Sequence, residues 1–173
     1  AIRDLGTIDD ISLTTNGTLL APLAHDLKHA GLSRVNISLD PLDAALYTQI
    51  TRGGLLHDAL AGIDAALACD FDPVKINAVA VRSLHQDYLA FARMSVDRPL
   101  HMRFIEYMPV GDSAGINGCG WGSEEVISCD EIRQRIDAEA VAQGLAPLVP
   151  LSQSEEPSGA GPARYWKFPD AQG

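Results

Sequence analysis

Short runs of branched apolar residues alternate with amphipathic helical patterns through the first 110 residues, and this alternation most constrains the fold. Four runs have strand character: Ile11–Thr15, Val35–Leu39, Val74–Val81 and Met102–Tyr107. Helical patterns separate and follow them at Pro22–Ala30, Leu42–Ile50, Leu56–Leu67 and Gln86–Met94. Short apolar strands that alternate with helices are typical of a parallel sheet covered on both faces. The sequence therefore predicts an α/β fold with about four parallel βα units.

Capping and turn residues indicate where these helices begin and end. Asp40 is placed to cap the helix over 42–50, and Gly31 suits the left-handed position after the helix over 22–30. Asn16-Gly17 favours a turn after the first strand. We therefore expect element boundaries close to the ranges given above.

The sequence changes character after Met108. Four features follow in order: a glycine-rich loop over Pro109–Ser123, a helix from Ser128 to about Gln143, a loop over Ser152–Pro162 and a strand over Arg164–Phe168. Ser128 and Glu131 match a capping box at the start of that helix. We therefore expect two parts: the sheet over residues 1–110, then a long loop, helix and the start of a C-terminal domain over residues 111–173.

Composition excludes several classes of function. Thirteen Lys and Arg against 23 Asp and Glu give a net charge of −10, which argues against broad binding to nucleic acid. No apolar run approaches the roughly 18 residues of a membrane span. Cys69, Cys119 and Cys129 lack the spacing of a zinc site or a disulfide scaffold. We expect a cytoplasmic protein with reduced thiols and no metal site in this chain, with neither nucleic acid nor a membrane as partner.

Polar side chains gather at the carboxyl ends of the predicted strands, where ligands bind in parallel α/β folds. The candidates are Thr14, Ser38, Lys75, Asn77, Arg103 and Met108. Lys75 and Arg103 stand out, because a cation within an apolar strand is costly to bury without an anion. The sequence therefore predicts one cavity that can hold an anionic ligand.

Each candidate also has a purely structural interpretation. Ser38 could cap the following helix, and Met108 could fill the core. Arg103 could form an internal ion pair with Glu106. The sequence has no phosphate-binding P-loop, dinucleotide fingerprint or hydrolase nucleophile elbow. Known motifs therefore do not decide between the structural and the ligand-binding interpretations of these residues.

Four phrases carry a family resemblance: SLTTNGTLL, LSRVNISLDPLD, VKINAVAV and MRFIEYMPVGD, in this order. Together they resemble the GTP 3′,8-cyclases, the radical S-adenosylmethionine enzymes that begin molybdenum cofactor (molybdopterin) biosynthesis. The resemblance implies an incomplete TIM-like (βα)6 barrel, of which this chain supplies strands three to six. It also implies conversion of GTP to (8S)-3′,8-cyclo-7,8-dihydroguanosine 5′-triphosphate by a radical derived from adenosylmethionine.

The same resemblance implies ligands and partners. Thr14 and Lys75 match GTP contacts, and Ser38 and Met108 match S-adenosylmethionine contacts. Arg103 matches a residue that lines the same cavity, and Asn77 is expected to line it too, neither with an assigned ligand. Full-length enzymes of this kind hold two 4Fe-4S clusters, and cyclic pyranopterin phosphate synthase takes the product in the next step of the pathway.

The sequence departs from the family pattern at both clusters. The C-x-x-x-C-x-x-C loop of the first cluster and the cysteines of the second are absent, and the three cysteines present match neither set. We therefore expect a central fragment that is cluster-free and inactive alone. The alternative is a non-catalytic βα module that binds a nucleotide or adenosylmethionine. In the fragment, Ile11–Thr15 would be an exposed parallel edge, and a homodimer is one way to cover it.

Overall fold

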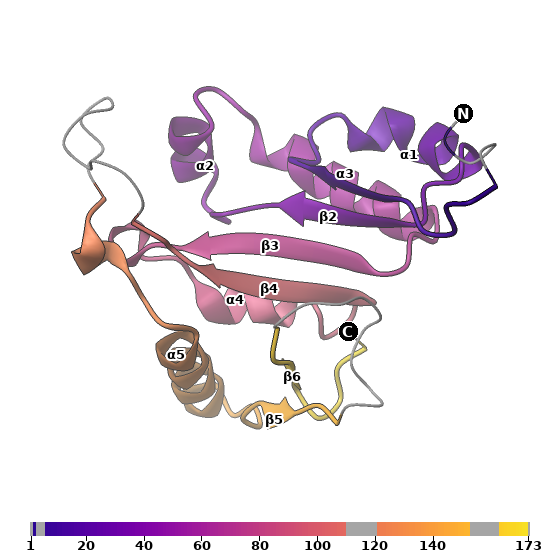
Figure 1. The fold of residues 1–173 in the computed structure, drawn as a ribbon. Helices are drawn as coiled ribbons and strands as arrows, with labels where there is room; N and C mark the ends of the chain where they lie inside the picture. Colours follow the sequence, from indigo (N-terminus) through magenta and orange to yellow (C-terminus); the bar gives the residue numbers. More distant parts are fainter. Residues whose placement is uncertain (1, 3–5, 110–120, 153–162, 173) are drawn as a thin grey trace.

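The computed structural model describes residues 2, 6–109, 121–152 and 163–172. Its centre is a parallel sheet in the order β1-β2-β3-β4. The strands are β1 (Ser12–Thr15), β2 (Arg34–Ser38), β3 (Val74–Ala80) and β4 (Leu100–Glu106). All four point the same way in Figure 1, so their carboxyl ends meet at one edge of the sheet. The predicted α/β fold with four parallel strands is confirmed.

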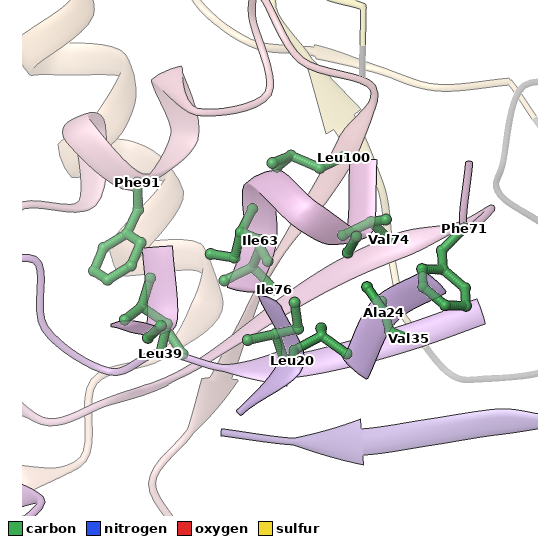
Figure 2. Packing of buried hydrophobic residues seen from close by; sticks show 14 of the residues in the cluster. Leu20, Ala24, Val35, Leu39, Ile63, Phe71, Val74, Ile76, Phe91 and Leu100 are labelled. Carbon is green, nitrogen blue, oxygen red and sulfur yellow. The ribbon is translucent and has the colours of Figure 1, made fainter. Parts of the chain in front are cut away.

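Helices cover one face of this sheet and bury the main core against it. The first four helices are α1 (Leu20–His29), α2 (Ala44–Ile50), α3 (Leu56–Ala68) and α4 (Tyr88–Arg93). Figure 2 shows the core between them and the strands, including Leu20, Ala24, Ile63 and Phe91 from helices and Val35, Val74, Ile76 and Leu100 from strands. Each large apolar side chain buried in this way stabilises the fold by about 1.5–3 kcal/mol.

The opposite face of the sheet differs from the expectation that both faces are apolar and covered. Side chains alternate between the two faces of a strand. The residues between the buried core positions therefore lie opposite α1, α3 and α4, and they include Asn36, Lys75 and Arg103. This face carries polar side chains rather than a second apolar layer.

The predicted cap of α2 is wrong by three residues. Asp43, not Asp40, is the N-cap, and its Oδ1 accepts a hydrogen bond from the Leu46 N–H at 2.7 Å. The Asp40 carboxylate instead accepts from the Val79 N–H at 2.8 Å, which links the end of β2 to β3. Burial raises the pKa of Asp40, and the bond from Val79 opposes that rise. Both aspartates suit a cap by residue type, so the contact with β3 decides between them.

Gln86 strengthens the same junction from a buried position. Its Nε2 donates to the backbone oxygens of Asp40 and Val79 at 2.7 and 2.8 Å. Its Oε1 accepts from the Val81 N–H at 3.0 Å and from the Tyr88 hydroxyl at 3.3 Å. A buried amide with both ends bonded fixes the chain segments that it joins. Gln86 therefore holds together the carboxyl ends of β2 and β3, where the candidate ligand residues lie.

The C-terminal elements pack next to α4 and β4. They are α5 (Cys129–Ala142), β5 (Val149–Pro150) and β6 (Trp166–Lys167), and β5 pairs with β6 in antiparallel fashion. The residues of α5 that share a core with α4 are Ile132, Ile136 and Ala140. The strand predicted over 164–168 is shorter in the structure, where β6 contains only Trp166 and Lys167. None of the helices in the described ranges is long and apolar enough to cross a bilayer.

Glu131 ties α5 to the segment after β3. Its carboxylate binds Arg82 at 2.9 Å and Arg135 at 2.7 Å, and hydrogen bonding to Arg82 is the main cause that lowers the pKa of Glu131 to about 2. Ser128 Oγ accepts from the Glu131 N–H at 3.1 Å, which confirms the predicted N-cap. The carboxylate turns to the two arginines rather than back to Ser128, so only half of the predicted capping box forms.

The loops predicted over 109–123 and 152–162 lie mostly outside the described residues, as does Cys119. The chain on either side of residues 110–120 is joined by one polar and one aromatic contact. The Tyr107 hydroxyl donates to the Trp121 backbone oxygen at 2.8 Å, and the two rings meet edge to face with centroids 5.7 Å apart. The segment that leads into α5 therefore begins beside the end of β4.

A close contact between two glycines fixes the turn after β1. Gly17 has a positive φ of 79° in the predicted Asn16-Gly17 turn, where Asn16 Oδ1 accepts from the Thr18 N–H at 3.2 Å. Helix α3 passes directly beneath this turn. A Cβ added at Gly62 would lie 2.2 Å from the Gly17 backbone oxygen, so only glycine fits there. The position of the turn beyond Thr14 thus depends on Gly62.

We expect Gly62→Ala to lower the free energy of unfolding by about 1–3 kcal/mol, because the added methyl group collides with backbone rather than with a movable side chain. Alanine normally stabilises a helix interior relative to glycine by about 1 kcal/mol. The exposed neighbour Ala61 gives the matched control, since Ala61→Gly should destabilise in the ordinary way. Urea denaturation measures both variants, and a more stable Gly62→Ala protein would contradict the packing argument.

Candidate functional site

The polar face of the sheet is organised into rows that run across the strands. Strand pairing places Thr14, Asn36, Lys75 and His101 side by side in one row, from β1 to β4. A second row, two residues farther along the strands, contains Ser38, Asn77 and Arg103. Two residues of a strand span about 6.6 Å. The second row therefore lies closer to the carboxyl edge by about that distance, and the first row lies deeper.

The structure brings together five of the six residues predicted from the sequence. Thr14 and Lys75, the residues matched to GTP, share the deeper row. Ser38, matched to adenosylmethionine, shares the outer row with Asn77 and Arg103. The two ligand assignments therefore fall on two adjacent layers of one surface.

Met108 is not part of either row. It lies two residues beyond the end of β4, and 69% of its surface is exposed. This exposure excludes the interpretation that Met108 fills the core. Its place beyond the strand leaves its side chain at the carboxyl edge rather than on the paired part of the sheet.

The structural alternatives for Ser38 and Arg103 are also wrong. Ser38 is exposed at the end of β2, and Asp43 caps α2 in its place. Arg103 and Glu106 form no ion pair in the described part of the chain, because residues three apart on a strand face opposite sides. Glu106 Oε1 instead accepts a hydrogen bond from the Cys129 N–H at 2.7 Å, at the start of α5.

Lys75 lies in a positive environment. Only 5% of its surface is exposed, although it lies on the polar face. Burial is the main cause that lowers the pKa of Lys75, and the charges of Arg103 and Arg34 lower it further. Arg34 itself is paired with Asp10. An anion bound in the deeper row would relieve the repulsion among these cations and stabilise the charged form of Lys75.

Asn77 presents a hydrogen-bond acceptor in the outer row. Its Oδ1 is buried and is not hydrogen-bonded to any group in the described residues. An unsatisfied buried carbonyl oxygen costs about 1–3 kcal/mol. A ligand that donates a hydrogen bond, such as an ammonium or hydroxyl group, would remove this cost. The outer row therefore suits a ligand with donors, and the deeper row suits one with negative charge.

Sequence reasoning missed two members of the deeper row, Asn36 and His101. Neither belongs to a recognisable motif, and only the register of the strands places them on either side of Lys75. Burial lowers the pKa of His101 and the charge of Lys75 adds to this effect, while Asp72 opposes it. The alternation of apolar and polar residues within each strand would have indicated their face, but not their row.

Both rows end on β4 beside a cavity of about 510 Å³. His101 and Arg103 line this cavity from the sheet, and Arg133 and Trp166 line it from α5 and β6. The guanidinium of Arg133 lies over the Trp166 ring at 5.8 Å and also pairs with Asp137 at 2.9 Å. Ala92 of α4 and Ile132 of α5 line it as well, so the cavity follows the open edge of β4 between the sheet and these helices.

The described residues offer no ligand set for a metal ion or cluster. Within the described ranges, no group of three or more His, Cys, Asp or Glu side chains is placed to bind a metal. Cys69 ends α3 and Cys129 begins α5, and each occurs without another cysteine in its element.

Several curated proteins are similar in sequence to this chain. GTP 3′,8-cyclase from Pelotomaculum thermopropionicum is 46% identical over 167 residues, which are 96% of this chain and 47% of that protein. GTP 3′,8-cyclase from Desulforamulus reducens is 41% identical over 168 residues, again 96% of this chain and 47% of the relative. GTP 3′,8-cyclase from Alkaliphilus metalliredigens is 38% identical over 173 residues, 99% of this chain and 48% of the relative. The chain spans about half the length of these curated relatives.

A family model matches the part of the chain that contains β1, β2 and β3, three of the four strands that carry the rows. The model of the radical SAM superfamily matches residues 1–93, more than half of the chain. It includes β1, β2 and β3 with the helices that cover them, which agrees with an incomplete TIM-like barrel. The parallel βα units, the polar face and this match together show that the chain belongs to the radical SAM superfamily.

Proposed function

We propose that this chain is part of a GTP 3′,8-cyclase, which converts GTP to (8S)-3′,8-cyclo-7,8-dihydroguanosine 5′-triphosphate in molybdenum cofactor biosynthesis. The observation that carries the proposal is the buried Lys75 of the deeper row beside an outer row that presents an unsatisfied acceptor. The relatives named GTP 3′,8-cyclase support it over nearly the whole chain. The activity belongs to a protein about twice as long.

The deeper row would bind GTP. Lys75 on β3 supplies a charge that a phosphate group would neutralise. Thr14 on β1 supplies a hydroxyl group in the same row. Lys75 is buried and its ammonium has little access to water, so its interaction with an anion is strong. Guanine and ribose would then extend from this row toward the outer one.

The outer row would bind S-adenosylmethionine, whose ammonium and ribose hydroxyl groups are donors that fit the free Oδ1 of Asn77. Ser38 would contact the same ligand, and Met108 would lie beside its adenine at the carboxyl edge. Arg103 shares this row, which favours the adenosylmethionine carboxylate as its partner. When bound, this cofactor supplies the hydrogen-abstracting chemistry of the superfamily.

The two 4Fe-4S clusters of a complete enzyme would need thiolates at set spacings, and the three cysteines of this sequence do not have the C-x-x-x-C-x-x-C spacing. The isolated chain would then be inactive. Residues 1–110 would form the barrel part, and residues 111–173 would begin the C-terminal part. A homodimer through the outer edge of β1, a cytoplasmic location and transfer of the product to cyclic pyranopterin phosphate synthase remain predictions.

An anaerobic assay tests the function itself. The chain, extended to the length of its relatives and reconstituted with iron and sulfide, is incubated with GTP, adenosylmethionine and a reductant. We expect 5′-deoxyadenosine together with the cyclised dihydroguanosine triphosphate. Ligand binding without either product would instead favour the non-catalytic βα module.

We expect Lys75→Met in the same extended protein to weaken GTP binding about ten- to a hundredfold, the loss of one charge-assisted contact of roughly 1.5–3 kcal/mol. Methionine retains the apolar stem, so packing in the strand changes little. Calorimetric titration should show adenosylmethionine affinity nearly unchanged. Lys28→Met, on α1, is the matched control. Equal losses for both ligands would assign Lys75 a structural role.

Ser38→Ala should raise the adenosylmethionine concentration needed for half-maximal activity about threefold to tenfold, since one neutral hydrogen bond is lost. The melting temperature should stay constant, because Ser38 is exposed and does not cap α2. Thr48→Ala, on the exposed side of α2, controls for general effects of hydroxyl removal. A lower melting temperature with unchanged cofactor requirement would show that the ligand assignment of Ser38 is wrong.

A further inference from the structure

His101 is the immediate neighbour of Lys75 on the polar face. The two residues are register partners on β3 and β4. Leu100 and Met102, on either side of His101, belong to the core beneath the helices. Because neighbours in a strand face opposite sides, the His101 imidazole lies on the same face as the Lys75 ammonium. It occupies the end of the deeper row, where this row meets the cavity along β4.

We infer that His101 is a further nucleotide-binding residue, which contacts the polyphosphate of GTP next to Lys75 and takes up a proton when GTP binds. The inference rests on the proposed function, because that function supplies GTP as the ligand of the deeper row. It adds a residue that neither the sequence phrases nor the resemblance assigns.

The position of His101 suits the phosphates rather than the base. Adjacent strands lie about 4.8 Å apart, so groups on Lys75 and His101 can contact neighbouring oxygens of one polyphosphate. The cavity of about 510 Å³ beyond β4 provides room for an extended chain of phosphates. The other end of the row carries the uncharged side chains of Thr14 and Asn36, which offer no charge to a phosphate.

The charges around His101 determine its protonation. Burial and Lys75 lower its pKa, and Asp72 opposes them. The other charged groups that face it or share its cavity are Arg103 and Glu106 on β4, Asp130 and Arg133 on α5, and Arg164 and Lys167 near β6. Arg133 and Arg164 are paired with acids at 2.9 and 3.7 Å. A polyphosphate adds negative charge at Lys75, so it raises the pKa of His101 and a solvent proton binds the imidazole.

Calorimetric titration of GTP at pH 7, in two buffers of different ionisation enthalpy, measures this proton. The protein is the chain extended to the length of its relatives, as wild type, His101→Gln and the exposed-surface control His57→Gln. Protonation of GTP itself contributes equally to all three. We expect wild type and His57→Gln to take up a few tenths of a proton more than His101→Gln. We also expect His101→Gln to weaken GTP about threefold to tenfold and to leave adenosylmethionine affinity unchanged.

A labelling experiment on the wild type keeps the inference testable if His101→Gln does not fold. Diethyl pyrocarbonate modifies accessible imidazoles, and mass spectrometry reports the modified fraction of His101. We expect GTP, but not adenosylmethionine, to protect it. Equal proton uptake by wild type and variant, or labelling that GTP does not change, would overturn the role of His101 while GTP binding stands. A wild-type protein that binds no GTP would overturn the proposed function, and this inference with it.

Discussion

The register of three parallel strand pairings determines the chemistry of this molecule, because it makes the two faces of the sheet different. The strands place most of their apolar residues under the helices and most of their polar residues, with Val79 and Ile105, on the other side. A shift of one residue in any pairing would exchange the faces of a whole strand and place charge in the core. The core beneath α1, α3 and α4 therefore stabilises the same register that aligns Thr14 with Lys75 and Ser38 with Asn77.

The edge where the strands end is held by contacts of residues that are not among the ligand candidates. Gln86 and the Asp40 carboxylate join β2 to β3, and Gly62 supports the turn after β1. The Oδ1 of Asn77, in contrast, is buried without a hydrogen bond from the described residues, a condition that lowers stability. The residues that hold this edge together are therefore different from the residues proposed to bind ligands. Such a division is expected where a bound ligand satisfies a group that folding leaves unsatisfied.

Sequence patterns predicted the strands, most helices and five members of the two rows, because short apolar runs, helical periodicity and strand ends are local properties. Two of the differences concern contacts between distant segments, and one concerns the two faces of a single strand. Asp40 and Asp43 are equivalent as caps until β3 offers the Val79 N–H to one of them. Arg103 and Glu106 do not form the ion pair that was considered, because residues three apart in a strand lie on opposite faces. Sequence reasoning missed His101 because its place beside Lys75 depends on how β3 and β4 pair, which neither strand sequence shows alone.

The spacing of the rows constrains how two ligands can react on this face. Reacting atoms must approach to about 3–3.5 Å, whereas the rows are separated by about 6.6 Å. If GTP is held by its phosphates at Lys75 and adenosylmethionine lies over Ser38 and Asn77, neither ligand can stay within its own row. The ribose of GTP must then point toward the carboxyl edge, and its phosphates must extend sideways to β4. Phosphates in this orientation would extend past Lys75 toward β4, where His101 is the next residue of the row.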